Sequence, residues 1–226
     1  MVTRVILAWI YRYFVNTGRS FSEEATLERE LYLSDGYFTP RRWIGFCGQV
    51  NAVRKVAPST LLEIGVGNGI VHQILLHMGV AATSFDINPH LNPDITGNLL
   101  AIGESVQAGS YDCVLCAEVL EHLPFALFDQ CLENIAYATR KHAIVTLPRT
   151  GNLFHAVVNL PKIKPLDMLF QVPMPYVPKG HHWEIDSAGY SRLARIIEHM
   201  EKFFTVKEYY RFPHEPKIYA FILEKK

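Results

Sequence analysis

Short runs of apolar residues alternate with amphipathic stretches along the middle of the chain. The runs at 61–64 and 111–116 have the length of buried strands, whereas the apolar residues at 70–78 recur at helical spacing. After the second of these strands, a helical pattern at 125–135 leads to a fifth apolar run at 142–147. Strands that alternate with helices predict an α/β fold with a largely parallel sheet.

The flanking segments add further elements to this fold. Thr39 and Pro40 are typical of a helix start and predict a helix that Pro58 ends. The stretches 203–210 and 216–223 predict the last two strands. We therefore expect an N-terminal helical extension over 1–57, followed by the core of the domain over 58–226.

Three glycines at alternate positions, Gly65, Gly67 and Gly69, follow the first predicted strand. A strand, a glycine turn and a helix start form the site at which open α/β sheets hold nucleotide-like ligands. The spacing differs from the dinucleotide fingerprint, and Glu63 would repel a pyrophosphate but suits a cationic ligand. A tight turn that binds nothing is the alternative. Asp86 favours ligand binding, because it ends a second predicted strand where such folds place a carboxylate for ribose hydroxyls.

At this point residues 58–148 resemble the class I S-adenosylmethionine-dependent methyltransferases and look most like their type 11 branch. The resemblance implies a single doubly wound, mostly parallel, Rossmann-like sheet of seven strands in the order 3-2-1-4-5-7-6, with strand 7 antiparallel. The stretch 88–93 is too short for a full helix between strands two and three. The resemblance rests on Glu63-x-Gly65-x-Gly67-x-Gly69, Asp86, the Gly97-Asn98 step and Glu118-Val-Leu-Glu-His-Leu123.

The resemblance also implies S-adenosyl-L-methionine as the cofactor and gives roles to the matching residues. The glycines would line the methionine and ribose portion, Asp86 would accept from the ribose hydroxyls, and Asn98 and Leu99 would border the adenine. Relatives usually carry aspartate at position 98, so we expect weaker adenine recognition through the amide carbonyl of Asn98. The implied cofactor-binding residues are Glu63, Gly65, Gly67, Gly69, Asp86, Asn98, Leu99, Ala117 and Glu118.

Methyl transfer requires alignment of the reacting atoms and removal of the acceptor's proton, for which histidine is a natural base. His122 is the first candidate because helical spacing would place it on the same face as Glu118; a structural role is the alternative. His181, His182 and Glu184 are assigned a substrate-facing or gating role, because a similar stretch lies near the acceptor pocket in the type 11 branch. Their spacing lacks a third zinc ligand, so no metal is expected.

Two apolar segments lie outside the predicted sheet. The stretch 149–180 contains five of the thirteen prolines and is expected to form no single regular element. It is interpreted as a substrate-side insertion over the carboxyl ends of the strands, with a disordered loop as the alternative. Residues 1–16 carry apolar side chains at helical spacing, which fits a core helix, a lid or a helix lying on a membrane.

Composition narrows the possible partners. Lys plus Arg and Asp plus Glu are balanced at 22 each, so no basic field favours nucleic acid. Cys113 and Cys116 fall on opposite faces of a predicted strand, which favours a buried, reduced pair over a zinc or redox site. The absence of a signal peptide or an apolar membrane span predicts a cytoplasmic location, peripheral at a membrane if residues 1–16 bind lipid.

The sequence thus predicts methyl transfer to a small-molecule, sugar or lipid-linked acceptor. A cofactor-binding regulatory protein without transferase activity is the second hypothesis. A nicotinamide-dependent oxidoreductase is the third, and the glycine spacing and Glu63 disfavour it. Neither the acceptor atom nor the oligomeric state follows from the sequence.

Overall fold

The computed structural model describes residues 25–226 apart from 159, 164–165 and 173–175. The apolar segment 1–16 therefore lies outside the described residues. Among the helices of the described part, none is long and apolar enough to cross a membrane.

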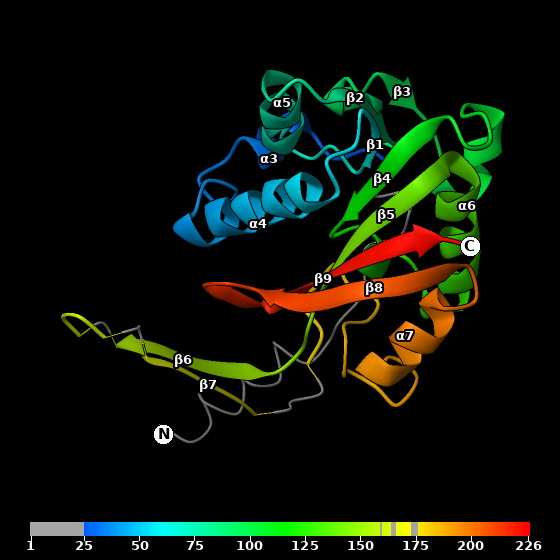
Figure 1. Cartoon of the computed structure of the whole chain (residues 1–226). Coiled ribbons are helices and arrows are strands. Elements are labelled where there is room, and N and C mark those ends of the chain that lie inside the picture. The colour runs from blue at the N-terminus through cyan, green and yellow to red at the C-terminus, as the bar shows by residue number, and fades with distance from the viewer. Residues whose placement is uncertain (1–24, 159, 164–165, 173–175) are drawn as a thin grey trace, which may run out of the picture.

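A seven-stranded sheet forms the centre of the molecule, with the order β3-β2-β1-β4-β5-β9-β8 (Figure 1). The first five strands of this order pair in parallel, and β9 is antiparallel to both of its neighbours. The expected topology is confirmed, with β8 and β9 in the places of strands six and seven. The strands are β3 (Ile95–Thr96), β2 (Ala81–Asp86), β1 (Thr60–Ile64), β4 (Tyr111–Ala117), β5 (Thr139–Pro148), β9 (Glu215–Lys225) and β8 (Phe204–Phe212).

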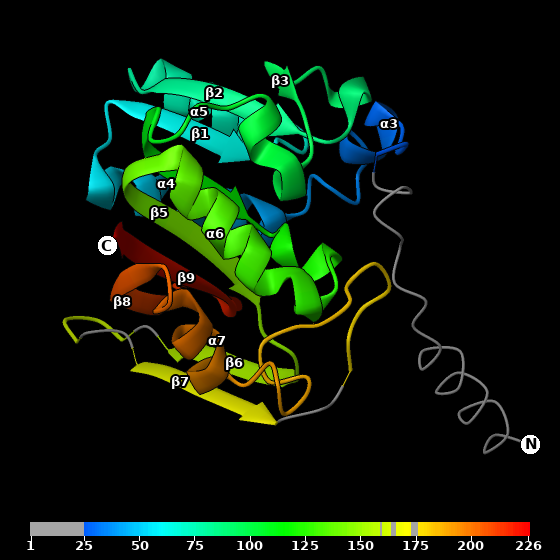
Figure 2. The same ribbon diagram turned by 90° about the vertical axis from the view of Figure 1, so that its right-hand side faces the viewer.

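Helices cover both faces of the sheet, α4 and α5 on one side and α6 and α7 on the other (Figures 1 and 2). The Thr39 hydroxyl accepts from the Arg42 backbone N–H, so the predicted start of α4 is confirmed. Asp186 accepts from the backbone N–H of Leu193, where α7 begins. The helices are α3 (Arg29–Tyr32), α4 (Pro40–Val56), α5 (Ile70–His77), α6 (Phe128–Ala138) and α7 (Leu193–Met200), and the 3-10 turns are η1 (Pro89–Leu91), η2 (Leu99–Glu104), η3 (Leu120–His122) and η4 (Phe125–Leu127).

The sheet separates two hydrophobic clusters. Cys113 belongs to the cluster beneath α4 and α5, and Cys116 belongs to the cluster beneath α6 and α7. Burial raises the pKa of both thiols. The prediction that the two cysteines are buried on opposite faces is confirmed, and neither has the exposed, low-pKa character of a reactive thiol.

The connection between β2 and β3 is as short as expected. It contains only η1, in which Asn88 caps the turn by accepting from the backbone N–H of His90. The carboxyl end of β2 therefore stays uncovered by a helix on this connection.

The insertion after β5 forms an antiparallel hairpin of β6 (Asn152–Val158) and β7 (Leu166–Val172), which extends away from the large sheet (Figure 1). The segment thus forms no single regular element, as expected, but two short strands that the sequence did not predict, and none of its prolines falls within either strand. Its large apolar side chains are not buried against the sheet: Phe154 is 64% exposed and its cross-strand partner Phe170 is 66% exposed.

Candidate functional site

The glycine turn connects the end of β1 to the start of α5. Gly65, Gly67 and Gly69 all have left-handed backbone conformations, with φ of 84°, 53° and 76°. A Cβ at Gly65 would lie 2.3 Å from Cγ2 of Val119, whereas a Cβ at Gly67 or Gly69 would meet no atom within 4 Å. Gly65 thus lets the turn pack against the loop after β4, and the other two glycines border open space where a ligand can approach the backbone.

Asp86 ends β2 beside this turn and organises it. One carboxylate oxygen accepts from the backbone N–H of Val66 at 2.9 Å and the other from Asn88 at 2.9 Å. Burial raises the pKa of Asp86, and backbone donors that include Gly67 oppose this shift. A carboxylate offers about four acceptor sites, and the hydrogen bonds from Val66 and Asn88 occupy one site on each oxygen.

Glu63 has a partner inside the protein. Its Oε2 lies 3.0 Å from Nδ1 of His72 on α5, and Nε2 of His72 lies 3.6 Å from Asp94. Burial is the main cause that raises the pKa of Glu63, and the hydrogen bond with Glu63 raises the pKa of His72. The carboxylate expected to suit a cationic ligand therefore already joins β1 to α5.

Asn98 and Leu99 begin η2 next to the carboxyl end of β3. The Asn98 side-chain oxygen accepts from the backbone N–H of Leu100 at 2.8 Å, so the amide caps this turn. Leu99 points into the core, and its carbonyl accepts from the side chain of Asn134. Of the two residues expected at the adenine, only Asn98 keeps a half-buried side chain, and its oxygen already accepts one hydrogen bond.

Ala117 ends β4, and Glu118 follows with a left-handed φ of 54°. Glu118 accepts from the hydroxyl of Thr146 at 3.0 Å. Burial raises the pKa of Glu118 to about 7, with the charges of His181 and Arg42 acting in the opposite direction. A non-glycine residue in this conformation costs about 1–3 kcal/mol, and such strain clusters at functional sites.

The expectation that helical spacing relates Glu118 to His122 was wrong. Only Leu120–His122 form a 3-10 turn, η3, and the left-handed backbone at Glu118 places that residue before it. His122 instead faces the loop before α7: its Nδ1 lies 2.9 Å from the carbonyl oxygen of Gly180. Trp183, which is buried, fixes the same loop by donating from its indole N–H to the carbonyl of Leu123.

This docking brings His181 to His122. The two rings meet edge to face with centroids 4.9 Å apart, and Nδ1 of His181 lies 2.9 Å from Oε1 of Glu184. Possible ligand atoms of Glu121, His122 and His181 all lie within 4.8 Å of one another. His182 is exposed. Its contact with this group is made by its backbone N–H, which donates to the Glu121 carbonyl. The structure thus brings together two of the three predicted histidines.

Several charged residues around these histidines were not predicted from the sequence. Glu121 is fully buried beside His122, and its place in the Glu-x-x-Glu-His run was a usable signal. Arg41 and Arg42, at the start of α4, are close enough to interact with the charge of Glu118. No local pattern indicates these arginines, because α4 reaches the site only through the packing of the whole fold.

A pocket of about 290 Å³ lies where β5 passes into the hairpin. One wall is cationic, although Arg149 there is paired with Asp186 at 2.5 Å. The pocket is lined by Arg149, Thr150, Leu169, Gln171, Asp186 and Arg211.

The sheet order, the open glycine turn after β1 and the carboxylate at the end of β2 define a Rossmann-like fold of the class I methyltransferase type. A sequence model of a family described as "Methyltransferase domain" matches residues 39–208. Because this match covers most of the chain, the protein belongs to the methyltransferase domain family.

Individual relatives agree with this assignment. The chain is 30% identical over 152 residues to the "Ubiquinone biosynthesis O-methyltransferase" of Xanthomonas axonopodis pv. citri, a match covering 60% of this chain and 59% of the relative. The chain thus spans less than two thirds of the length of that protein.

Solved structures share the fold at low sequence identity. The N-methyltransferase NodS of Bradyrhizobium japonicum, solved with S-adenosyl-L-homocysteine, gives a TM-score of 0.58 at 13% identity over 90% of this chain and 95% of that one. A SAM-dependent methyltransferase from Archaeoglobus fulgidus gives a TM-score of 0.59 at 13% identity over 87% of this chain and 99% of that one.

Proposed function

We propose that the protein transfers a methyl group from S-adenosyl-L-methionine to an oxygen atom of a small-molecule acceptor. The observation that carries this proposal is the open turn at Gly67 and Gly69 beside the Asp86 carboxylate, at the carboxyl edge of the sheet. Membership of the methyltransferase domain family supports the reaction. The relative named as an O-methyltransferase supports oxygen as the acceptor atom.

The residues of the turn fit the proposed cofactor. A Cβ at Gly67 or Gly69 would enter the space next to the backbone, so these glycines leave room for a ligand. In the proposal they line the methionine and ribose portion, Asp86 accepts from the ribose hydroxyls, and Asn98 and Ala117 border the remainder. When bound, the sulfonium supplies an already activated methyl group. The protein then has to align the acceptor and exclude water from it.

The acceptor proton is the second task of the site. We propose that His122 and His181, whose rings are in contact where the loop before α7 meets η3, face the acceptor side. Glu118 extends this set, because burial brings its pKa to about 7 and so close to that of a histidine. His182 remains a gating candidate of the sequence analysis, with a backbone contact in its favour.

The position of the hairpin argues against the second hypothesis, a cofactor-binding protein without transferase activity. That hypothesis requires the 149–180 segment to fill the acceptor site, whereas β6 and β7 extend away from the sheet and expose Phe154 and Phe170. The nicotinamide hypothesis is not favoured by the family match.

Binding and turnover separate these possibilities. Calorimetry should show binding of S-adenosylhomocysteine and none of NAD⁺ at the same concentrations. Labelled S-adenosylmethionine should then transfer its methyl group to phenolic or other hydroxyl acceptors in a panel that also contains amines. Cofactor binding without turnover on any acceptor would favour the regulatory hypothesis, and selective methylation of amines would contradict the oxygen assignment.

We also propose contact with a membrane surface through residues 1–16, as their apolar spacing in the sequence allows. The exposed Phe154 and Phe170 pair on the hairpin supports an apolar contact on this protein, because such side chains are seldom clustered in water without a partner. A cytoplasmic location remains a prediction of the sequence. In a flotation assay the full chain should rise with the liposomes, and a chain without residues 1–16 should not. Equal flotation of the two would contradict the proposal.

A further inference from the structure

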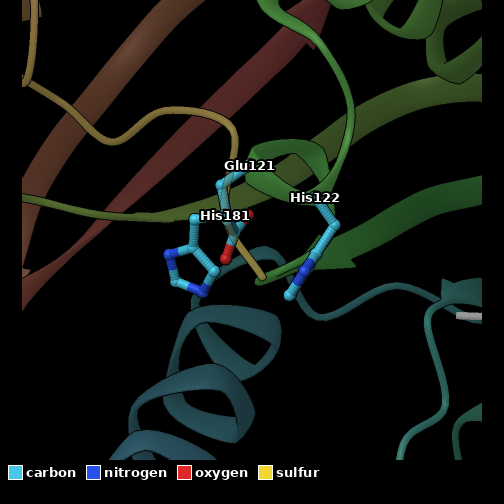
Figure 3. Close-up of side chains that lie close together, drawn as sticks. All are labelled: Glu121, His122 and His181. Atoms are coloured by element: carbon cyan, nitrogen blue, oxygen red, sulfur yellow. The ribbon is translucent and has the colours of Figure 1, made fainter. Parts of the chain in front are cut away.

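Three side chains with metal-binding chemistry converge after β4. Oxygen or nitrogen atoms of Glu121, His122 and His181 lie within 4.8 Å of one another (Figure 3). Glu121 is fully buried and the two histidines are half-buried. We propose that these three residues bind one divalent cation of the first transition row, beside the acceptor.

The hydrogen bonds behind the two imidazoles favour this role. His122 faces the Gly180 carbonyl oxygen through Nδ1 at 2.9 Å, and His181 faces a Glu184 oxygen through Nδ1 at 2.9 Å. A carbonyl or carboxylate oxygen can only accept, so each Nδ1 carries the proton and each neutral ring has its lone pair on Nε2. Metal-binding histidines almost always have such an acceptor behind them, because it fixes the tautomer and the orientation of the ring.

The surrounding charges also favour a cation. Glu118 and Glu184 interact electrostatically with each other and add negative charge next to His181. Arg42 supplies opposing positive charge, and Arg41 is held by two hydrogen bonds to a carboxylate elsewhere, on Glu215. A divalent cation would offset the repulsion among the buried carboxylates at this place.

Two imidazoles and one carboxylate indicate which cation fits. This set suits zinc, manganese, iron or cobalt, whereas calcium and magnesium prefer oxygen ligands alone. Ligand atoms about 2.1 Å from one ion lie at most about 4.2 Å apart, so small side-chain movements would close the observed spread. Three protein ligands leave coordination positions open for water or substrate.

The inference departs from the expectation that no metal binds. That expectation considered only neighbours in the sequence, His181, His182 and Glu184, which lack a third ligand at the usual spacing. In the folded chain the residues that lie beside His181 are Glu121 and His122, which come from the turn after β4.

The chemical role rests on the proposed function. A cation beside an acceptor hydroxyl lowers the pKa of that hydroxyl, so its proton is released to water near neutral pH. The oxygen then forms a bond to the methyl carbon while the carbon–sulfur bond breaks and its electron pair stays on sulfur. In this arrangement His122 is a metal ligand and not the base.

Cobalt is a suitable probe because its visible absorption reports nitrogen ligation. The chelator-treated full chain should bind one Co²⁺ with visible bands, and Zn²⁺ should displace it. Glu121→Gln, His122→Gln and His181→Gln should each weaken Co²⁺ binding at least tenfold. Glu184→Gln, which removes the acceptor behind His181, should weaken it about 10- to 100-fold. His77→Gln, at an exposed histidine on α5, is the matched control and should bind within twofold of the native chain.

Binding and activity test the two ideas separately. A folded chain that binds S-adenosylhomocysteine but neither Co²⁺ nor Zn²⁺ would overturn the metal site and leave the proposed function standing. Loss of Co²⁺ binding in His77→Gln alone would also overturn it. Co²⁺ binding at the assigned residues without turnover on any acceptor would support the site and contradict the proposed function. Turnover unaffected by chelators would overturn the cation's role in the reaction.

Discussion

Replacing Asp86 by alanine should weaken cofactor binding and loosen the turn that forms the site. The carboxylate accepts from two backbone N–H groups, those of Val66 and Asn88, both at 2.9 Å. Each donor left without a partner costs about 1–3 kcal/mol, so some loss of stability must accompany the loss of binding. A charge-assisted bond to a ribose hydroxyl is worth about 1.5–3 kcal/mol. One lost bond therefore lowers affinity about tenfold or more, and two lower it about 100-fold or more.

Asp86→Asn separates the two effects in part. An amide has only one oxygen, so its NH₂ group would face either the Val66 or the Asn88 donor, and one of the two turn bonds is lost. We expect an affinity between those of the native chain and Asp86→Ala. Calorimetry with S-adenosylhomocysteine measures the affinity, and thermal unfolding checks that each variant is folded.

A matched control lies at the other end of the sheet. Asp112, at the start of β4, also accepts from a backbone N–H, that of Thr60, and pairs with Lys141. Asp112→Asn should alter stability but leave the affinity for S-adenosylhomocysteine within twofold. Unchanged affinity in folded Asp86→Ala, or an equal loss in Asp112→Asn, would refute the assignment of Asp86 to the cofactor site.

Two further predictions concern the turn and its buried ion pair. Gly65→Ala should destabilise the protein by about 1–3 kcal/mol more than Gly79→Ala, because the new Cβ at position 65 would lie 2.3 Å from Val119. Gly79 is the control, since it has the same left-handed backbone and a Cβ there would meet no atom within 4 Å. Equal unfolding free energies of the two variants in urea would contradict this prediction. The raised pKa of His72 means that its pair with Glu63 stabilises the fold below the ordinary histidine pKa and is lost as pH rises through the folded value. Urea unfolding between about pH 6 and 9 should therefore show a steeper loss of stability for the native chain than for His72→Gln, and parallel pH dependences would exclude the pair as the cause.

The sheet was predictable because local patterns agree with the global fold. The central strands β1, β4 and β5 contain largely apolar runs, and buried parallel strands need no alternation of polar and apolar positions. The cap at Thr39 and the glycines before α5 were predictable for the same reason: a single residue type satisfies a single backbone requirement. The hairpin after β5 was not predicted because the prolines of this segment indicate irregular structure, although they all lie outside the two strands.

The candidate site was only partly predictable, since its contacts join residues far apart in the sequence. Glu63 precedes the glycines, yet only the packing of α5 on β1 pairs it with His72. Glu121 and His181 are separated by the whole of α6, β5 and the hairpin, and the docking of the loop at Gly180 on η3 brings them together. Such contacts follow from tertiary packing and carry no local signal.

The loop after β4 connects the two halves of the site. Val119 occupies the space that a side chain at Gly65 would need, so the glycine turn and this loop are in direct contact. The next residues in the chain, Glu121 and His122, hold the group that also includes His181. Glu118, with its left-handed backbone, lies between β4 and η3, where the chain passes from the proposed cofactor side to the proposed acceptor side. A change that displaces this loop should therefore alter cofactor affinity and metal binding together, whereas a change at Asp86, on β2, should lower the cofactor affinity and leave metal binding in the folded protein unchanged.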